Sequence, residues 1–328
     1  MAEARVICTI GPRSATPEVW HSLINAGATG FRIPFAKEDP DTQFTRAASM
    51  SREFGSSIDI FADLPGTAPR TLNNRPYEIG GRKSISLVPE TDTDDDTIPI
   101  SMWTTVNKHL EPGMHVVFGD GEVAGSVTGV SAASITIQPE HVDGPLRQRR
   151  RIAWQGWERV ASPMGDFERL VVADSRMEFV TGIMWSFVSS PAQLEEISNR
   201  FPHLRSKESC AKVEGDDAVE CLDAIANAAD SLLLGQGDLL VSSGDRKFVQ
   251  HIQTVASFAN SRPEYPIIVG TGLLDNYASG ILSRAELGYL ALLIQSRITG
   301  FMLAGETTIG DNAVECVRLL NDLLQASR

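Results

Sequence analysis

The fold is decided by the stretch Ser209-Cys-Ala-Lys-Val-Glu214, in which a short apolar strand ends in one ammonium and one carboxylate. Residues i and i+2 of a strand share a face, so Lys212 and Glu214 are expected to point into the same cavity. A surface salt bridge is the alternative for such a pair taken alone. A second acidic strand end next in the chain would favour a functional site.

The next strand-like stretch supplies that second acid. Ser231-Leu-Leu-Leu-Gly-Gln-Gly-Asp238 is apolar until it ends in a glycine turn and an aspartate. Two carboxylates at neighbouring strand ends, beside a lysine, are typical of a site for a divalent metal and a phosphate, because Mg²⁺ and Mn²⁺ prefer oxygen ligands. Glu214 and Asp238 are therefore the predicted metal ligands, beside Lys212.

Apolar strands alternate with helical patterns on both sides of this pair, and the helical patterns include 216–229 and 248–260. The strand-like stretches are 5–12, 30–35, 58–64, 179–187, 209–214, 231–238, 265–271 and 300–306. Such alternation predicts parallel strands joined by helical crossovers, and eight strands of this kind are typical of an α/β (β/α)8 TIM barrel. Barrel active sites lie at the carboxyl ends of the strands. At or near these ends the sequence has Arg32, Asp63, Lys212, Glu214, Asp238 and Thr271.

The pattern changes between about residues 71 and 160. This region has little helical periodicity and much β-like alternation, with turn signals such as Gly119-Asp-Gly121. We therefore predict a small all-β module inserted after the third strand, with residues 1–70 and 161–328 forming the barrel and 71–160 a lid. Its acidic run at 90–96 is expected to be a solvated loop, with a metal site as the weaker alternative. The arginines at 147 and 149–151 are either a surface patch or a phosphate clamp.

The composition of the chain argues against several classes of function. The 328 residues are 42% hydrophobic and 22% charged, which is typical of a soluble globular protein. No apolar run approaches the roughly 20 residues of a membrane span, and the N-terminus lacks a signal pattern, so a cytoplasmic protein is expected. A net charge of −13 argues against general nucleic-acid binding. Four widely spaced cysteines predict buried free thiols.

Several short strings resemble motifs of one enzyme family. They are Cys8-Thr-Ile-Gly-Pro12, Gly30-Phe-Arg-Ile-Pro-Phe35, Ala62-Asp-Leu-Pro-Gly66, Ala211-Lys-Val-Glu214, Gly235-Gln-Gly-Asp-Leu239, Gly270-Thr-Gly-Leu-Leu274, Ser283-Arg-Ala-Glu286 and Met302-Leu-Ala-Gly-Glu-Thr307. Each string alone is weak evidence, whereas their order and spacing together are strong. On these motifs the chain resembles the pyruvate kinase family over nearly its whole length, including that family's inserted β-domain.

The resemblance implies a phosphotransferase that handles an enolate, with phosphoenolpyruvate and ADP giving pyruvate and ATP at a Mg²⁺ or Mn²⁺ ion. It implies that Lys212 stabilises the transferring phosphoryl group and the enolate, while Glu214 and Asp238 hold the metal. Backbone amides around Gly237 and Asp238 would hold the substrate carboxylate, and Thr271 would lie near the proton path. Such chemistry needs positioned cations in a water-poor cleft.

The same resemblance assigns further contacts. Arg32 and Arg70 would grip the transferring phosphate, Asp120 would come from the lid, and Thr9 with Pro12 would line the nucleotide pocket. Asp63 would be a cation ligand at the end of the third strand.

The sequence also departs from the family. Three of the family's four monovalent-cation ligands are replaced, by Pro34, Ala36 and Leu64, so only Asp63 remains and a potassium site is not supported. Lys37 supplies a tethered positive charge there or is a solvated surface lysine. Pro65, Gln236 and Gly272 replace the family's lysine, arginine and glutamine.

Other departures concern the substrate and regulation. Glycines 235, 237, 270 and 272 either leave room for a substrate larger than pyruvate or only let the backbone turn. The family's C-terminal allosteric domain is expected to be absent, and with it sugar-phosphate regulation and the usual oligomer contacts, while a homo-oligomer stays open.

Three functions remain open from the sequence. The first is a divergent phosphotransferase acting on a 2-oxo acid or its enol phosphate with ADP or ATP. The second is a metal-dependent aldolase or decarboxylase that stabilises an enolate without nucleotide chemistry. The third is a catalytically silent binding protein. Loss of three cation ligands favours the second and third, and retention of Arg32, Arg70, Lys212, Glu214, Asp238 and Thr271 argues against the third.

Overall fold

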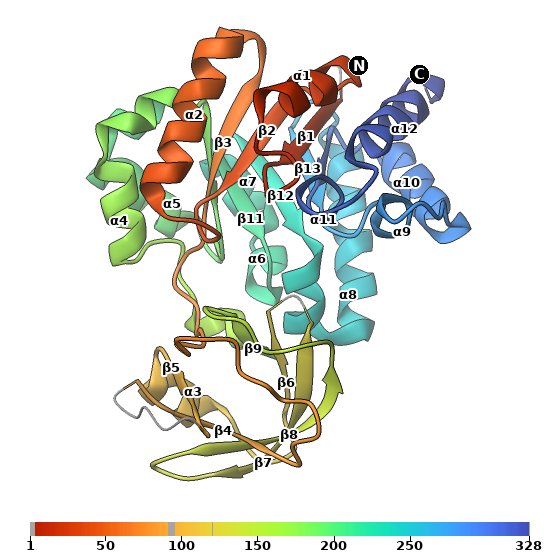
Figure 1. The fold of residues 1–328 in the computed structure, drawn as a ribbon. Helices are drawn as coiled ribbons and strands as arrows, with labels where there is room; N and C mark the ends of the chain where they lie inside the picture. The colour runs from red at the N-terminus through yellow and green to blue at the C-terminus, as the bar shows by residue number, and fades with distance from the viewer. Residues whose placement is uncertain (1–3, 91–95, 120, 328) are drawn as a thin grey trace. The chain divides into compact units, whose positions relative to one another are not determined.

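The computed structural model describes residues 4–90, 96–119 and 121–327 (Figure 1). The chain divides into two compact units. The larger unit consists of Met1–Gly66, Pro163–Leu239 and Asp245–Arg328, and the smaller of Thr67–Ser162 with Leu240–Gly244. Each unit has its own sheet.

The larger unit is built on a closed barrel of eight parallel strands, which confirms the predicted fold class. The strands are β1 (Arg5–Thr9), β2 (Gly30–Pro34), β3 (Asp59–Leu64), β10 (Gly182–Trp185), β11 (Glu208–Val213), β12 (Ser231–Gly235), β13 (Ile267–Gly270) and β14 (Gly300–Leu303). Their order around the barrel is β1-β14-β13-β12-β11-β10-β3-β2. Consecutive barrel strands are therefore neighbours, as right-handed helical crossovers require.

Helices connect the barrel strands. They are α1 (Pro17–Asn25), α2 (Pro40–Phe54), α4 (Asp166–Ala173), α5 (Pro191–Arg200), α6 (Asp216–Glu220), α7 (Leu222–Ala228), α8 (Gln236–Ser261), α9 (Asp275–Ala278), α10 (Arg284–Gln295), α11 (Gly305–Thr308) and α12 (Ala313–Ala326). Short 3-10 turns are η1 (Gly55–Ser57), η3 (Ser175–Phe179) and η4 (Pro202–Ser206).

Two helices differ from the sequence prediction. The helix expected over 216–229 is split at Cys221, which joins α6 to α7 with a non-helical φ of −98° and ψ of 14°. The helix expected from residue 248 begins at Gln236, directly after β12, and is interrupted by Gly244 at φ 73°. Glycine tolerates this positive φ, so the helix is interrupted at Gly244. The interruption also breaks the helical spacing of apolar residues, so the sequence before residue 248 resembles a loop.

Two apolar layers form the core of this unit. The barrel interior is filled by Ile7, Phe61, Met184, Cys210, Leu233, Ile268 and Met302. A larger layer packs the outer faces of the strands against the helices. Because both faces of the strands are buried, the strands are continuous apolar runs in the sequence rather than alternating ones.

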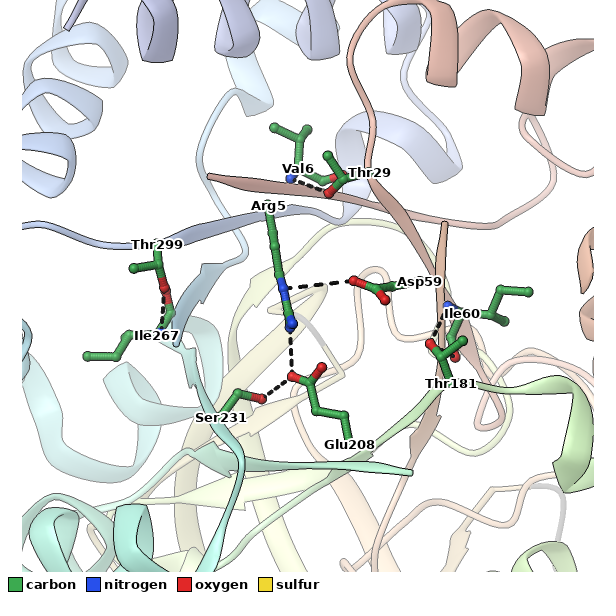
Figure 2. Close-up of polar contacts among 10 residues, drawn as sticks. All are labelled: Arg5, Val6, Thr29, Asp59, Ile60, Thr181, Glu208, Ser231, Ile267 and Thr299. Atoms are coloured by element: carbon green, nitrogen blue, oxygen red, sulfur yellow. Dashed lines mark hydrogen bonds and ion pairs between the residues drawn. The ribbon is translucent and has the colours of Figure 1, made fainter. Parts of the chain in front are cut away.

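The same hydrogen bond between a side chain and the backbone recurs at the amino-terminal ends of several strands. Thr29, Thr181 and Thr299 each precede the glycine that opens a strand, and Figure 2 shows each hydroxyl beside a backbone amide of the preceding strand. The acceptor distances are 3.0 Å from Val6 N, 2.8 Å from Ile60 N and 2.7 Å from Ile267 N. Asp230 does the same before β12, where Oδ2 accepts from Ser209 N at 2.8 Å. Every second strand is thus tied to its predecessor at its start.

An ion pair spans the same end of the barrel. Arg5 on β1 donates from NH1 to Glu208 Oε1 at 2.6 Å, and β11, which carries Glu208, lies opposite β1 in the ring (Figure 2). Ser231 Oγ donates to the same oxygen at 2.6 Å, and Asp59 Oδ2 lies 3.8 Å from Arg5 Nε. This network closes the amino-terminal end, so chemistry is expected at the opposite, carboxyl end.

The smaller unit contains a six-stranded sheet in the order β5-β4-β8-β7-β6-β9. Its strands are β4 (Ile85–Pro89), β5 (Ile98–Ile100), β6 (His115–Phe118), β7 (Val123–Val130), β8 (Ile135–Val142) and β9 (Ile152–Trp154). It also contains η2 (Trp157–Val160) and a short helix, α3 (Trp103–His109), that the prediction of an all-β module missed. Only Val106 of α3 is buried, so the helix leaves no apolar period in the sequence.

Two charged features of the smaller unit were predicted in alternatives. Arg150 pairs with Glu122 at 2.7 Å and Arg151 donates to Gly119 O at 3.1 Å, whereas Arg147 and Arg149 are exposed. The basic run is thus partly structural. Most of the acidic run, residues 91–95, lies outside the described residues.

Three of the four cysteines, Cys8, Cys210 and Cys316, are buried free thiols as predicted, while Cys221 is partly exposed. Among the helices that the structure describes, none is both long enough and apolar enough to cross a membrane.

Candidate active site

Lys212 is the centre of a cluster at the carboxyl ends of three adjacent strands, β3, β10 and β11. Its Nζ lies 2.9 Å from Glu214 Oε1 and 3.3 Å from Asp63 Oδ1, and it donates to Ser186 Oγ at 2.8 Å. Only 9% of the Lys212 side chain is exposed. Burying an ammonium is costly unless it is paired, and here two carboxylates and a hydroxyl compensate.

The turn after β10 holds both members of the Lys212–Glu214 pair. Ser186 Oγ accepts from Lys212 and donates to Leu64 O at 2.7 Å, so both of its hydrogen-bonding roles are used. The next residue, Phe187, donates its backbone N–H to Glu214 Oε2 at 2.9 Å. Phe187 has a φ of 60°, which is unfavourable for a residue with a side chain. This strained turn places Ser186 Oγ against the Lys212 ammonium and the Phe187 N–H against the Glu214 carboxylate.

Arg32 binds the same aspartate from the other side. Its Nε and NH2 both donate to Asp63 Oδ2, at 3.0 and 2.5 Å. Its NH1 donates to Thr9 Oγ1 at 3.2 Å. Thr9 is buried, so its hydroxyl orients Arg32. Asp63 therefore lies between two cations, Arg32 at Oδ2 and Lys212 at Oδ1.

These contacts determine the charges of the cluster. Burial raises the pKa of Asp63, but Arg32 and Lys212 outweigh it and hold that pKa below its usual range. Burial lowers the pKa of Lys212, but Asp63 and Glu214 outweigh it and leave the pKa raised. Asp63 is thus an anion and Lys212 a cation at neutral pH.

Glu214 differs from Asp63. Burial raises its pKa to about 7, where the lowering effect of Lys212 is countered by the nearby negative charge of Asp238. Gly235 allows this packing, since a Cβ there would lie 2.7 Å from Glu214 Cγ. A divalent cation bound by Glu214 and Asp238 would relieve their repulsion, so this donor pair fits Mg²⁺ or Mn²⁺.

The protein supplies few metal ligands at this place. Within residues 4–90, 96–119 and 121–327, no group of three or more His, Cys, Asp or Glu side chains is arranged to hold a metal ion. A metal at Glu214 and Asp238 would therefore take its remaining ligands from water or substrate, as Mg²⁺ commonly does.

Thr271 lies beside the first turn of α8, which carries Gly237 and Asp238. A Cβ placed on Gly237 would be 3.6 Å from Thr271 Cγ2. Thr271 is exposed and has a φ of 77°, a second strained residue at the strand ends. Gln236 donates from Nε2 to Thr271 O at 3.0 Å and to Gly270 O at 3.3 Å.

Other predicted site residues are exposed, belong to the smaller unit or lie outside the described residues. Pro12 is exposed in the turn after β1, and Lys37 is exposed after β2. Arg70 belongs to the smaller unit, where its NH1 donates to Arg149 O at 3.2 Å. Asp120 lies outside the described residues.

Sequence reasoning missed four residues of this region: Ser186, Phe187, Gln236 as a structural contact, and Tyr289. For Ser186 a signal existed, because a serine near the end of the apolar stretch 179–187 is placed like the polar residues at the other strand ends. The positive φ of Phe187 leaves no local trace in the sequence, and neither does the contact of Tyr289 on α10, whose hydroxyl donates to Gln236 Oε1.

Comparison with known proteins gives one consistent result. A family model described as "Pyruvate kinase, barrel domain" matches residues 1–317. Among curated relatives, a pyruvate kinase of Agrobacterium vitis is 25% identical and covers 98% of this chain, and one of Sporosarcina psychrophila is also 25% identical over 98%. This chain spans 69% of the first relative's length but only 56% of the second's.

Two solved structures share the fold. A pyruvate kinase of Cryptosporidium parvum aligns with a TM-score of 0.79 at 21% identity, covering 99% of this chain and 69% of that one. A structure of Cryptosporidium parvum pyruvate kinase in complex with ADP aligns with a TM-score of 0.85 at 20% identity, covering 100% and 68%.

Proposed function

Because the chain belongs to the pyruvate kinase family, we propose that it is a phosphotransferase that acts on phosphoenolpyruvate and pyruvate, or on a related 2-oxo acid, with ADP or ATP and a divalent metal. The observation that carries this proposal is the buried Lys212 ammonium, 2.9 Å from Glu214 and 3.3 Å from Asp63 at the strand ends. A fixed cation of this kind stabilises negative charge that develops on an enolate or a transferring phosphoryl group.

Each residue of the cluster has a proposed role. Lys212 neutralises the enolate oxygen and the phosphoryl oxygens, and Arg32 adds a second cation for the phosphoryl group. Glu214 and Asp238 would hold Mg²⁺ or Mn²⁺, which polarises the bound oxygens as a Lewis acid when present. Backbone amides near Gly237 orient the substrate carboxylate.

Thr271 is proposed to hold or move the proton at the methylene carbon of the enolate. Its Cγ2 lies 3.6 Å from the place that a Cβ on Gly237, in the first turn of α8, would occupy. Arg70, Asp120, Thr9 and Pro12 stay proposed contacts of the phosphate and nucleotide. For Thr9 the hydroxyl contact to Arg32 favours positioning of that arginine over direct nucleotide binding.

A monovalent cation, which the family also implies, fits these residues poorly. The side chains of Pro34, Ala36 and Leu64 carry no oxygen. The carbonyl of Pro34 accepts from Gln43 Nε2 at 2.8 Å, and the carbonyl of Leu64 accepts from Ser186 Oγ at 2.7 Å. Each of these backbone oxygens therefore already accepts a protein hydrogen bond.

The remaining carboxylate is also engaged. Asp63 contacts Arg32 at one oxygen and Lys212 at the other, whereas Lys37 is exposed. We therefore assign the charge balance of Asp63 to Arg32 and Lys212, and no step of the reaction depends on a monovalent cation.

A metal-dependent lyase is the second candidate. It is favoured by one observation: Gln236 and Pro65 stand where the family has basic residues, while Lys212, Glu214 and Asp63 are retained and in contact. An aldolase or decarboxylase would use the same cations to stabilise an enolate.

Ligand binding separates these functions. Thermal unfolding is measured with Mg²⁺ and ADP, and with Mg²⁺ and oxalate, a mimic of the pyruvate enolate. A phosphotransferase is expected to be stabilised by both ligand sets. Stabilisation by oxalate with none by any nucleotide would remove the kinase function in favour of the lyase. Exchange of pyruvate methyl protons with D₂O, followed by NMR, tests whether the enolate site is active at all.

A further inference from the structure

Gln236 connects the start of α8, directly after β12, to the turn after β13. It is the first residue of α8, and only 8% of it is exposed. Its Nε2 donates to Thr271 O at 3.0 Å and to Gly270 O at 3.3 Å. One side-chain amide therefore holds two consecutive carbonyl groups, and one of them belongs to Thr271.

The amide of Gln236 has a defined orientation. Carbonyl oxygens only accept hydrogen bonds, so the NH₂ group must face Gly270 and Thr271, and Oε1 must face the other way. There Oε1 accepts from the hydroxyl of Tyr289, which lies on α10. Since an amide oxygen only accepts, Tyr289 must be the donor and must stay protonated. Burial raises the pKa of Tyr289 to about 12, so the hydroxyl keeps its proton around neutral pH.

Thr271 needs such support because its backbone is strained. A threonine at φ 77° occupies a region that β-branched residues rarely adopt. A strained residue keeps such a conformation only when its surroundings fix it. The neighbouring Gly272, also at φ 73°, adds no side chain that could do so. The two hydrogen bonds from Gln236 hold the peptide groups before and after Thr271, which together set its φ and ψ.

We propose that Gln236 and Tyr289 are positioning residues that hold the strained turn at Thr271 and so aim its hydroxyl at the substrate carbon. The relay runs from α10 through the Gln236 amide to the carbonyl of Thr271. The assignment of Thr271 to the proton path rests on the proposed function, whereas the positioning of Thr271 does not.

Tyr289→Phe and Gln236→Leu break the relay at its two links. Tyr289→Phe keeps the ring and removes only the donor to Oε1. Gln236→Leu keeps the approximate shape and removes both donors to the carbonyl groups. Tyr265→Phe is the matched control, because Tyr265 is also partly buried and its hydroxyl donates to a backbone carbonyl, Ala229 O at 3.0 Å, at the other end of β13.

The first measurement is the NMR signal of the Thr271 methyl group, assigned by its loss in Thr271→Val. Both relay variants are expected to shift this signal, and Tyr265→Phe is expected to leave it in place. The second is the rate of pyruvate methyl-proton exchange with Mn²⁺ present. Because small displacements of a reacting group cost up to about a hundredfold in rate, we expect about a tenfold loss in Tyr289→Phe and a larger one in Gln236→Leu.

Two further readouts distinguish positioning from general destabilisation. Affinity for Mn²⁺ with oxalate is expected to stay within about twofold of the parent protein, since the relay acts on Thr271 and not on the proposed metal ligands, Glu214 and Asp238. In a Thr271→Val background, Tyr289→Phe is expected to cause no further loss, because the relay acts only through Thr271.

An unshifted Thr271 signal in both relay variants would overturn the proposal, as would an equal rate loss in Tyr265→Phe or a full additional loss in the Thr271→Val background. If the parent protein exchanges no methyl protons, the proposed function fails, and the Thr271 methyl signal alone then decides the positioning of this turn.

Discussion

Lys212 Nζ lies 3.3 Å from Asp63 Oδ1, and this contact joins the fifth barrel strand to the third. Ser186, which follows the strand between them, binds the same ammonium at 2.8 Å. Asp63, Ser186 and Lys212, from the ends of three neighbouring strands, thus meet in a single cluster. An ammonium fixed in this way loses little further freedom when a substrate binds, which is the condition for electrostatic stabilisation of a developing anion.

Lys212→Met is expected to abolish turnover and methyl-proton exchange while leaving Mn²⁺ affinity largely intact. Asp63 keeps Arg32 as its counter-ion, and Glu214 keeps the amide of Phe187. Mn²⁺ binding is measured by calorimetry above pH 7, because loss of the lysine leaves Glu214 more easily protonated. Asp238→Ala is the contrasting variant and should lose both activity and metal. Unchanged metal affinity in Asp238→Ala would refute the ligand assignment.

Gly235→Ala is expected to weaken Mn²⁺ binding by about tenfold or more, because the added Cβ would lie 2.7 Å from Glu214 Cγ and must displace that side chain. Gly288→Ala, within α10, is the control. Among the described residues, no atom beyond its chain neighbours and its own helix backbone lies within 4 Å of the place that a Cβ on Gly288 would occupy. Alanine there should stabilise the helix by about 0.5–1 kcal/mol. Equal metal affinity in both variants would show that Gly235 does not shape the carboxylate site.

The sequence was sufficient for the barrel and for the charged end of β11 at Lys212 and Glu214, whereas β12 ends at Gly235 and the predicted strand-end residue Asp238 lies in the first turn of α8. Strands buried on both faces are recognisable as apolar runs, and a polar residue such as Lys212 at the end of such a run stands out. Phe187, Gln236 and Tyr289 were not predicted as site residues, because their roles depend on a positive φ or on contacts between residues far apart in the chain. Gln236 and Tyr289 are separated by 53 residues. Short helices such as α3, in which one residue is buried, show no periodic pattern of apolar residues and were therefore also missed.

Replacement of K⁺ by tetramethylammonium at constant ionic strength is expected to leave the thermal midpoint and the Mn²⁺–oxalate affinity unchanged. The reason is that Asp63 already contacts Arg32 and Lys212, and the carbonyls of Pro34 and Leu64 accept protein donors. Na⁺ serves as the control for nonspecific salt effects. A K⁺-specific rise in either quantity would contradict the internal charge balance.

Glu208→Gln is expected to destabilise the barrel by about 1–3 kcal/mol, because it removes the charge that Arg5 and Ser231 share at the amino-terminal end. Arg13→Met breaks a second ion pair, between Arg13 and Asp311, whose side chains are 58% and 72% exposed. Such exposed pairs contribute about 0–1 kcal/mol. Urea unfolding compares the two variants, and an equal loss would show that the Glu208 network adds nothing beyond a surface pair.

Asp275→Asn is expected to change the pH dependence of stability. Burial, together with Glu306 and Glu286, raises the pKa of Asp275 to about 6 from an ordinary value of 3.8. The folded state therefore binds this proton more tightly than the unfolded state does. The stability that Asp275 contributes is fully present below pH 3.8 and is lost as the pH rises through about 6. Relative to the parent protein, Asp275→Asn should accordingly become more stable as the pH rises from about 4 to about 7.

Asp174→Asn provides the opposite sign. Hydrogen bonds from Arg176 lower the pKa of Asp174, so its contribution is present above the unfolded value of 3.8 and is lost as the pH falls through the lowered folded value. Thermal midpoints of the three proteins between about pH 3 and pH 7 should therefore diverge in opposite directions. Parallel curves for Asp275→Asn and the parent protein would mean that Glu306 and Glu286 do not act on Asp275, because only a shifted proton affinity makes the difference between them depend on pH.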